Sequence, residues 1–139
     1  MEGNDRSFAA AVLLIGVTYA VVGVVFAWPS DHVVVWRLAA WVVSALAFAG
    51  HIGYERFWLH NEPRRAALHV ALAVAIGGFG LALSANIHSF LVVTPAPQRR
   101  LLLIALAVWP ILTGGPSFLV ALAASAALAR LTRRPAAPR

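Results

Sequence analysis

Three ionisable side chains stand close to the ends of two long apolar segments. His51 and Glu55 lie four residues apart in one segment, and His69 follows in the next, beyond a short charged loop. Residues four apart share one face of a helix, so His51 and Glu55 are expected to point the same way. If the chain turns back near residues 62–63, Glu55 lies level with His69, roughly 10 Å in from the turn. The sequence therefore predicts that the three side chains converge.

Two imidazoles and one carboxylate suit two kinds of chemistry. They are a ligand set for zinc or non-haem iron, so a metal, if one is bound, would be held by His51, Glu55 and His69. The same group could carry protons or couple them to a substrate, because histidine titrates near neutral pH. Ionisable groups inside a membrane span mark functional sites. The plain alternative is that all three are hydrated in the headgroup zone, and residues 59–65 are expected to be only a solvated loop.

The composition is that of a membrane protein. Of the 139 residues, 61% are hydrophobic and 12% are charged, and the mean hydropathy is +0.81. Soluble domains have about 45–50% apolar and about 25% charged residues. The chain has no cysteine, which excludes disulfides, thiolate metal sites and cysteine nucleophiles. The length suits one domain.

Four apolar runs are long enough to span a bilayer, which needs about 20 residues per helix. Proline and charge separate the runs, as is typical of turns. The predicted fold is all-α: an integral membrane bundle of four transmembrane helices, in one domain covering residues 1–139. The spans are expected at residues 8–28, 33–58, 66–93 and 101–131, followed by a short basic tail at 132–139.

The distribution of arginine predicts the orientation. All eleven basic residues are arginine, which indicates a GC-rich bacterial genome and hence the bacterial inner membrane. The positive-inside rule places the side with more arginines in the cytoplasm. Both termini and the 59–65 loop are therefore expected to be cytoplasmic. That side carries eight arginines (Arg6, Arg56, Arg64, Arg65, Arg130, Arg133, Arg134 and Arg139), and the other side carries Arg37, Arg99 and Arg100.

A second, sparser polar group is expected near the outer boundary of the membrane. It consists of Asp31, His32, Asn86 and His88. For Asn86, and for Ser84 two residues before it, we expect hydrogen bonds between helices, each worth about 1 kcal/mol in a bilayer. This group is therefore interpreted mainly as packing.

The fourth span contains two prolines that each remove a backbone hydrogen-bond donor, so we expect this helix to be kinked or broken between Pro110 and Pro116. A turn near residue 97 would place this region opposite two glycines of the third span. Such a zone can be a binding or permeation site at a broken helix. Alternatively, small residues only let the helices approach closely. The residues of this midplane group are Gly77, Gly78, Pro110, Gly114, Gly115, Pro116 and Ser117.

These patterns leave three functions open. The first is transport or permeation of a small solute or ion by a homo-oligomer. The second is a metal- or haem-binding membrane protein for electron transfer or metal handling, and the third is an accessory subunit of a larger membrane complex. No catalytic residue is assigned, since no base lies level with Ser117 and none of the common catalytic or nucleotide-binding motifs occurs. We expect no cofactor, no nucleic acid, and the lipid bilayer as the main partner.

Overall fold

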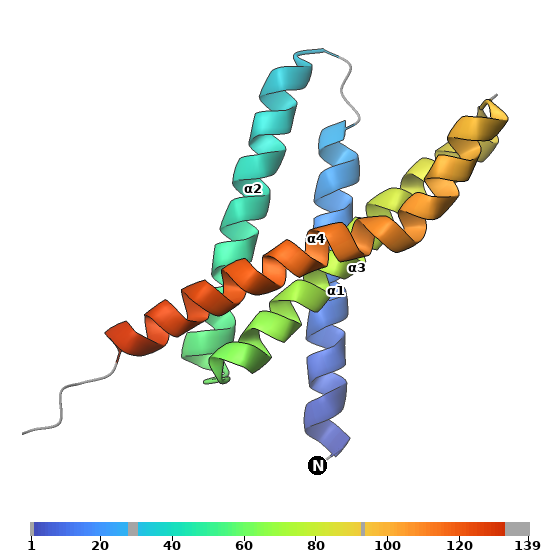
Figure 1. Cartoon of the computed structure of the whole chain (residues 1–139). Coiled ribbons are helices and arrows are strands. Elements are labelled where there is room, and N and C mark those ends of the chain that lie inside the picture. Colours follow the sequence, from blue (N-terminus) through green and yellow to red (C-terminus); the bar gives the residue numbers. More distant parts are fainter. Residues whose placement is uncertain (1, 28–30, 93, 133–139) are drawn as a thin grey trace, which may run out of the picture.

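The chain folds into four long helices in the computed structural model, which describes residues 2–27, 31–92 and 94–132 (Figure 1). The all-α prediction is confirmed, and the described residues contain no strand. The second helix continues directly into a five-residue π-helix, η1. The elements are α1 (Glu2–Ala27), α2 (Val33–Gly53), η1 (Tyr54–Trp58), α3 (Pro63–Leu91) and α4 (Ala96–Leu131).

Three of the helices are long and apolar enough to cross a membrane: Val33–Trp58, Pro63–Leu91 and Ala96–Leu131. The apolar stretch described in α1, Ala10–Phe26, is shorter. The predicted end of the first span at residue 28, and the basic tail at 133–139, lie outside the described residues. These three apolar helices thus lie close to the residues predicted for spans two to four.

The helix starts follow the chemistry of proline. α3 begins at Pro63, three residues before the predicted start, because proline at the first helical position lacks only a donor that the helix would leave unused. α4 likewise begins directly after Pro95. It then continues through Pro110 and Pro116 without interruption, so the predicted break in the fourth helix is wrong. A kink there stays a prediction.

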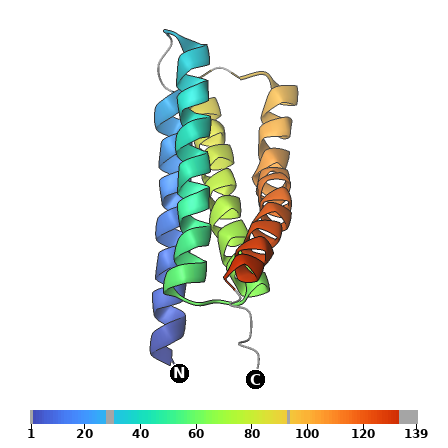
Figure 2. The same cartoon turned by 90° about the vertical axis from the view of Figure 1, so that its left-hand side faces the viewer.

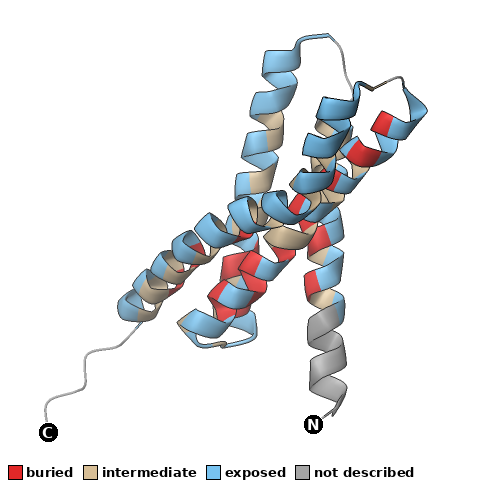
Figure 3. Ribbon diagram, turned by 45° about the vertical axis from the view of Figure 1, so that its right-hand side comes forward, coloured by how far each residue is buried: buried red, intermediate tan, exposed pale blue. Residues whose placement is uncertain are grey.

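α3 is the central helix of the bundle. It packs along α4 on one side and along α1 on the other. Figure 1 shows the α3–α4 pair crossing α1 and α2 obliquely, and Figure 2 shows α3 between α1 and α4. Most of the buried residues accordingly lie on α3, as the red segments of Figure 3 show.

α2 packs against α1, and near its C-terminal end it joins a buried cluster with α3 and α4. There Ile52 is buried with Ala67, Val70 and Ala121, and Phe48 packs against the cluster. We call this part of the molecule the loop end, meaning residues 59–62 and the helix ends beside them. Toward the opposite end, α2 and α4 separate (Figures 1 and 2). We call that part the far end, meaning residues 31–32, the end of α3 and the start of α4.

Candidate functional site

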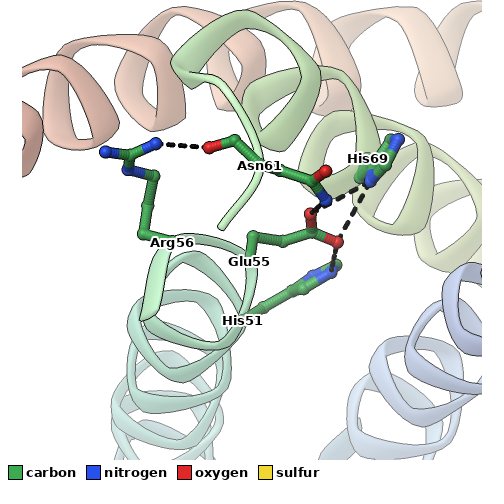
Figure 4. Close-up of polar contacts among 5 residues, drawn as sticks. All are labelled: His51, Glu55, Arg56, Asn61 and His69. Carbon is green, nitrogen blue, oxygen red and sulfur yellow. Dashed lines mark hydrogen bonds and ion pairs between the residues drawn. The ribbon is translucent and has the colours of Figure 1, made fainter. Parts of the chain in front are cut away.

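The structure brings His51, Glu55 and His69 together at the loop end (Figure 4). Nδ1 of His69 lies 3.0 Å and 3.1 Å from the two carboxylate oxygens of Glu55, and it must be the donor because a carboxylate only accepts. Nε2 of His51 lies 3.7 Å from Oε1 of Glu55, which is longer than a hydrogen bond, so this contact is electrostatic. All three residues are at most 5% exposed. Protein rather than solvent therefore surrounds them.

A widened helical turn holds Glu55 in this position. The backbone N–H of Leu59 donates to the carbonyl of Tyr54, five residues earlier, instead of four as in an α-helix. Short π segments of this kind are frequent at functional sites. Within η1, Glu55 is buried while Tyr54 and Trp58 are exposed and stack on each other with their ring centroids 6.5 Å apart. The turn thus directs the one acidic side chain of η1 inward.

The loop contributes a further member, Asn61, which the sequence did not indicate. Its side-chain amide donates to Oε2 of Glu55 at 2.6 Å, and its backbone N–H donates to the carbonyl of Glu55 at 3.0 Å. The expectation that residues 59–65 are only a solvated loop is therefore wrong. The helix α3 already begins at Pro63, and Asn61 is half-buried against the site. An amide six residues after a carboxylate, across a tight turn, is the signal that could have identified it.

Arg56 occupies the other side of Asn61 (Figure 4). Its Nη1 donates to the backbone carbonyl of Asn61. Glu55 and Arg56 are neighbours in sequence, yet their side chains point in different directions, so Asn61 connects them through its amide and its carbonyl. The loop is in this way fastened to η1 from both sides.

The polar atoms of this group are bonded to different extents. The carboxylate of Glu55 has a donor from α3, a donor from the loop and an imidazole from its own helix. The imidazole of His51 is not fully bonded, since its Nδ1 is buried and has no hydrogen-bond partner among the described residues. One ring nitrogen of a buried imidazole is thus left unused in the group.

The metal hypothesis gains no support from this geometry. Among the described residues, no group of three or more histidine, cysteine, aspartate or glutamate side chains is arranged to hold a metal ion. In the group of His51, Glu55 and His69, the carboxylate oxygens instead face the imidazole nitrogens directly at hydrogen-bond or ion-pair distance.

The polar residues at the far end do not form a comparable group. Asp31, His32 and His88 are exposed, and His32 adopts a left-handed backbone conformation (φ 54°) where α2 begins. Asn86 is buried and donates instead to the carbonyl of Leu102 on α4 at 2.7 Å. The predicted hydrogen bond between helices is thus present for Asn86.

Three glycines of the midplane group, Gly77, Gly78 and Gly114, serve close packing between helices. A Cβ added at Gly77 would lie 2.5 Å from Cβ of Tyr19 on α1, and one at Gly78 would collide with Thr113 on α4. A Cβ at Gly114 would lie 3.0 Å from Cβ of Ala75. These distances leave no room for a side chain. Glycine therefore lets α3 approach both of its neighbours, which is the packing alternative stated above.

The remaining midplane residues do not converge on a common point. Gly115 and Pro116 are exposed, and a Cβ at Gly115 would meet no described atom within 4 Å. The hydroxyl of Ser117 donates to the carbonyl of Thr113 in its own helix at 2.6 Å. Ser117 is thus used locally, and Pro110 is only half-buried. A binding site at this depth stays a prediction.

Comparisons with protein-family models, with curated proteins and with solved structures find no match for this chain.

Proposed function

We propose that the chain is a four-span protein of the bacterial inner membrane that moves protons, alone or together with a small solute, as a homo-oligomer. Both termini and the loop end face the cytoplasm in this proposal. It is supported by three helices long and apolar enough to span a bilayer and by the arginine asymmetry of the sequence.

The observation that carries the proposal is the burial of Glu55 between two buried histidines. A carboxylate that is 3% exposed is costly to keep in a membrane protein unless it is paired and hydrogen-bonded. If the hydrogen bonding served only to hold the helices together, one pair of polar side chains would be enough. Here the chain places three titratable groups from two helices in contact, which is the composition of a proton relay.

The homo-oligomer and a bend in α4 are parts of the same proposal. The titratable group lies at one end of the bundle, and a pathway to the other side would have to continue along a surface shared with further copies. A bend at Pro110–Pro116 would widen such a surface, since proline in a helix interior removes a hydrogen bond and displaces the preceding turn.

Proton flux into liposomes tests the proposal. The purified protein is reconstituted with the pH-sensitive dye pyranine inside, and a pH gradient is imposed with potassium and valinomycin to balance charge. We expect flux above that of protein-free liposomes, reduced at least tenfold by Glu55→Gln and unchanged by Glu62→Gln, which alters an exposed acid of the same loop end. Absence of protein-dependent flux would overturn the proposal and leave the accessory-subunit hypothesis.

The orientation has a separate test. Because the chain contains no cysteine, single cysteines can be introduced at Glu62 and at Gln98, which lie at opposite ends of α3 and α4 and are exposed. A membrane-impermeant maleimide added to intact spheroplasts should label Gln98→Cys and not Glu62→Cys. The reverse pattern would contradict a cytoplasmic loop end.

A further inference from the structure

An open cleft of about 270 Å³ lies between η1 and the C-terminal end of α4. Its lining is divided into an apolar part, Phe57 and Leu128, and a polar part, Arg56, His60 and Thr132. The cleft is separate from the group of His51, Glu55 and His69, which faces α3. An amphiphilic ligand would match both parts of this lining.

Arg56 is the cation of the cleft, and its hydrogen-bonding capacity is not used up. A guanidinium has five N–H donors. Nη1 donates to the carbonyl of Asn61, whereas Nε is buried without a hydrogen-bond partner among the described residues. No ion pair joins Arg56 to a carboxylate in the described part of the chain, and the neighbouring Glu55 is bonded elsewhere. A half-buried guanidinium with unused N–H donors is suited to bind an anion that has two acceptor oxygens.

We propose that this cleft binds the phosphate of an anionic phospholipid headgroup, with an acyl chain lying against Phe57 and Leu128. The inference rests on the proposed function only in placing the loop end at the cytoplasmic leaflet. Arginine binds phosphate through two parallel N–H···O bonds, and basic pockets between helices on this side of a membrane recognise anionic headgroups.

The charges around the cleft favour the same ligand. Arg64, Arg65 and Arg130 are exposed at the same end of the bundle and raise the local positive potential. The last carbonyls of α4 carry partial negative charge, and the hydroxyl of Thr132 donates to one of them, that of Leu128, at 3.0 Å. The phosphate is therefore expected on the Arg56 side of the cleft, away from Thr132.

A lipid bound here would act on the candidate site through one residue. Arg56 contacts the carbonyl of Asn61, and the side-chain amide of Asn61 donates to Glu55. A phosphate that fixes the guanidinium also fixes this loop residue. Anionic lipid is thus expected to hold the Glu55 group in its bonded arrangement.

Native mass spectrometry of the delipidated full-length protein tests this assignment. Phosphatidylglycerol and phosphatidylcholine are titrated separately in mild detergent. We expect one phosphatidylglycerol per chain, bound at least tenfold more tightly than phosphatidylcholine. Arg56→Gln should weaken it about tenfold, the loss of one charge-assisted contact. The matched control Arg100→Gln removes an equal charge from an exposed position at the far end, outside the cleft, and should change affinity less than twofold.

Three outcomes would overturn the assignment. They are equal losses in Arg56→Gln and Arg100→Gln, equal binding of the two lipids, and displacement of the lipid by glycerol phosphate at equal concentration. If Arg56→Gln does not fold, Arg56→Lys is measured in its place. Lysine keeps the charge but loses the paired donors, so this variant should bind phosphatidylglycerol about threefold more weakly than the unchanged protein. The assay needs no flux, so lipid binding without proton movement would refute only the proposed function.

Discussion

The two ends of the bundle carry similar residue types and use them differently. The loop end buries His51, Glu55 and His69 in mutual contact, whereas the far end leaves Asp31, His32 and His88 exposed. The difference follows from packing. At the loop end α2 meets α3 and α4 through Ile52 and Phe48, and at the far end α2 and α4 separate.

This contrast shows that the distance of a residue from the end of its helix does not by itself determine whether it belongs to a site. His88 and His69 are both on α3, each near one end of the helix. His69 is buried and bonded to Glu55 of η1, whereas His88 is exposed. Where three helices converge, an ionisable side chain is removed from solvent and must find partners. Where they diverge, it can remain solvated and needs none.

The largest expected effect tests the loop end directly. Glu55→Ala removes the acceptor shared by the buried His69 and the half-buried Asn61, so we expect the free energy of unfolding to fall by about 3 kcal/mol. The measurement is reversible unfolding in mixed micelles. Glu62→Ala, at an exposed position, should cost no more than about 0.5 kcal/mol. Equal losses of unfolding free energy in the two variants would contradict the contrast between the buried and the exposed acid.

The next effect concerns the central helix on which both ends depend. Gly77→Ala places a methyl group 2.5 Å from Cβ of Tyr19 and forces α1 away from α3, so we expect a loss of about 2 kcal/mol in the same assay. Gly115→Ala is the matched control, because its methyl group would meet no described atom within 4 Å. It should be neutral or stabilise α4 by up to about 1 kcal/mol. A tolerated Gly77→Ala would refute the close packing described for this pair of helices.

The smallest effects belong to the far end. Asn86→Ala loses the hydrogen bond to the carbonyl of Leu102 and should cost about 1 kcal/mol. His88→Ala, two residues later and exposed, should change stability by less than about 0.5 kcal/mol. If His88→Ala proved as costly as a change in the group of His51, Glu55 and His69, the far end would contain a site that its exposure does not indicate.

Much of the fold and part of the site could be predicted from the sequence. Length and hydropathy located three of the apolar helices, and the turn near residues 62–63 correctly placed Glu55 beside His69. These predictions succeed because the rise of a helix fixes how far each residue lies from a turn.

The rest depends on which helix faces meet. Spanning helices are apolar nearly all round, so no amphipathic stripe marks the face that packs against a neighbour. The central place of α3 and the separation of α2 from α4 could not be foreseen for this reason. Asn61 lies six residues after Glu55, but its contact with Glu55 depends on the widened turn of η1, which no residue pattern in the sequence predicts.

A double-mutant cycle on Glu55 and His69 tests most directly whether the loop end is an assembled group. Unfolding free energies are measured for Glu55→Gln, His69→Ala and the double variant, with Arg37 and His88 as the reference pair from the far end. The account predicts a coupling of about 1–2 kcal/mol for Glu55 and His69, and none beyond error for Arg37 and His88. Additive effects for Glu55 and His69 would contradict it.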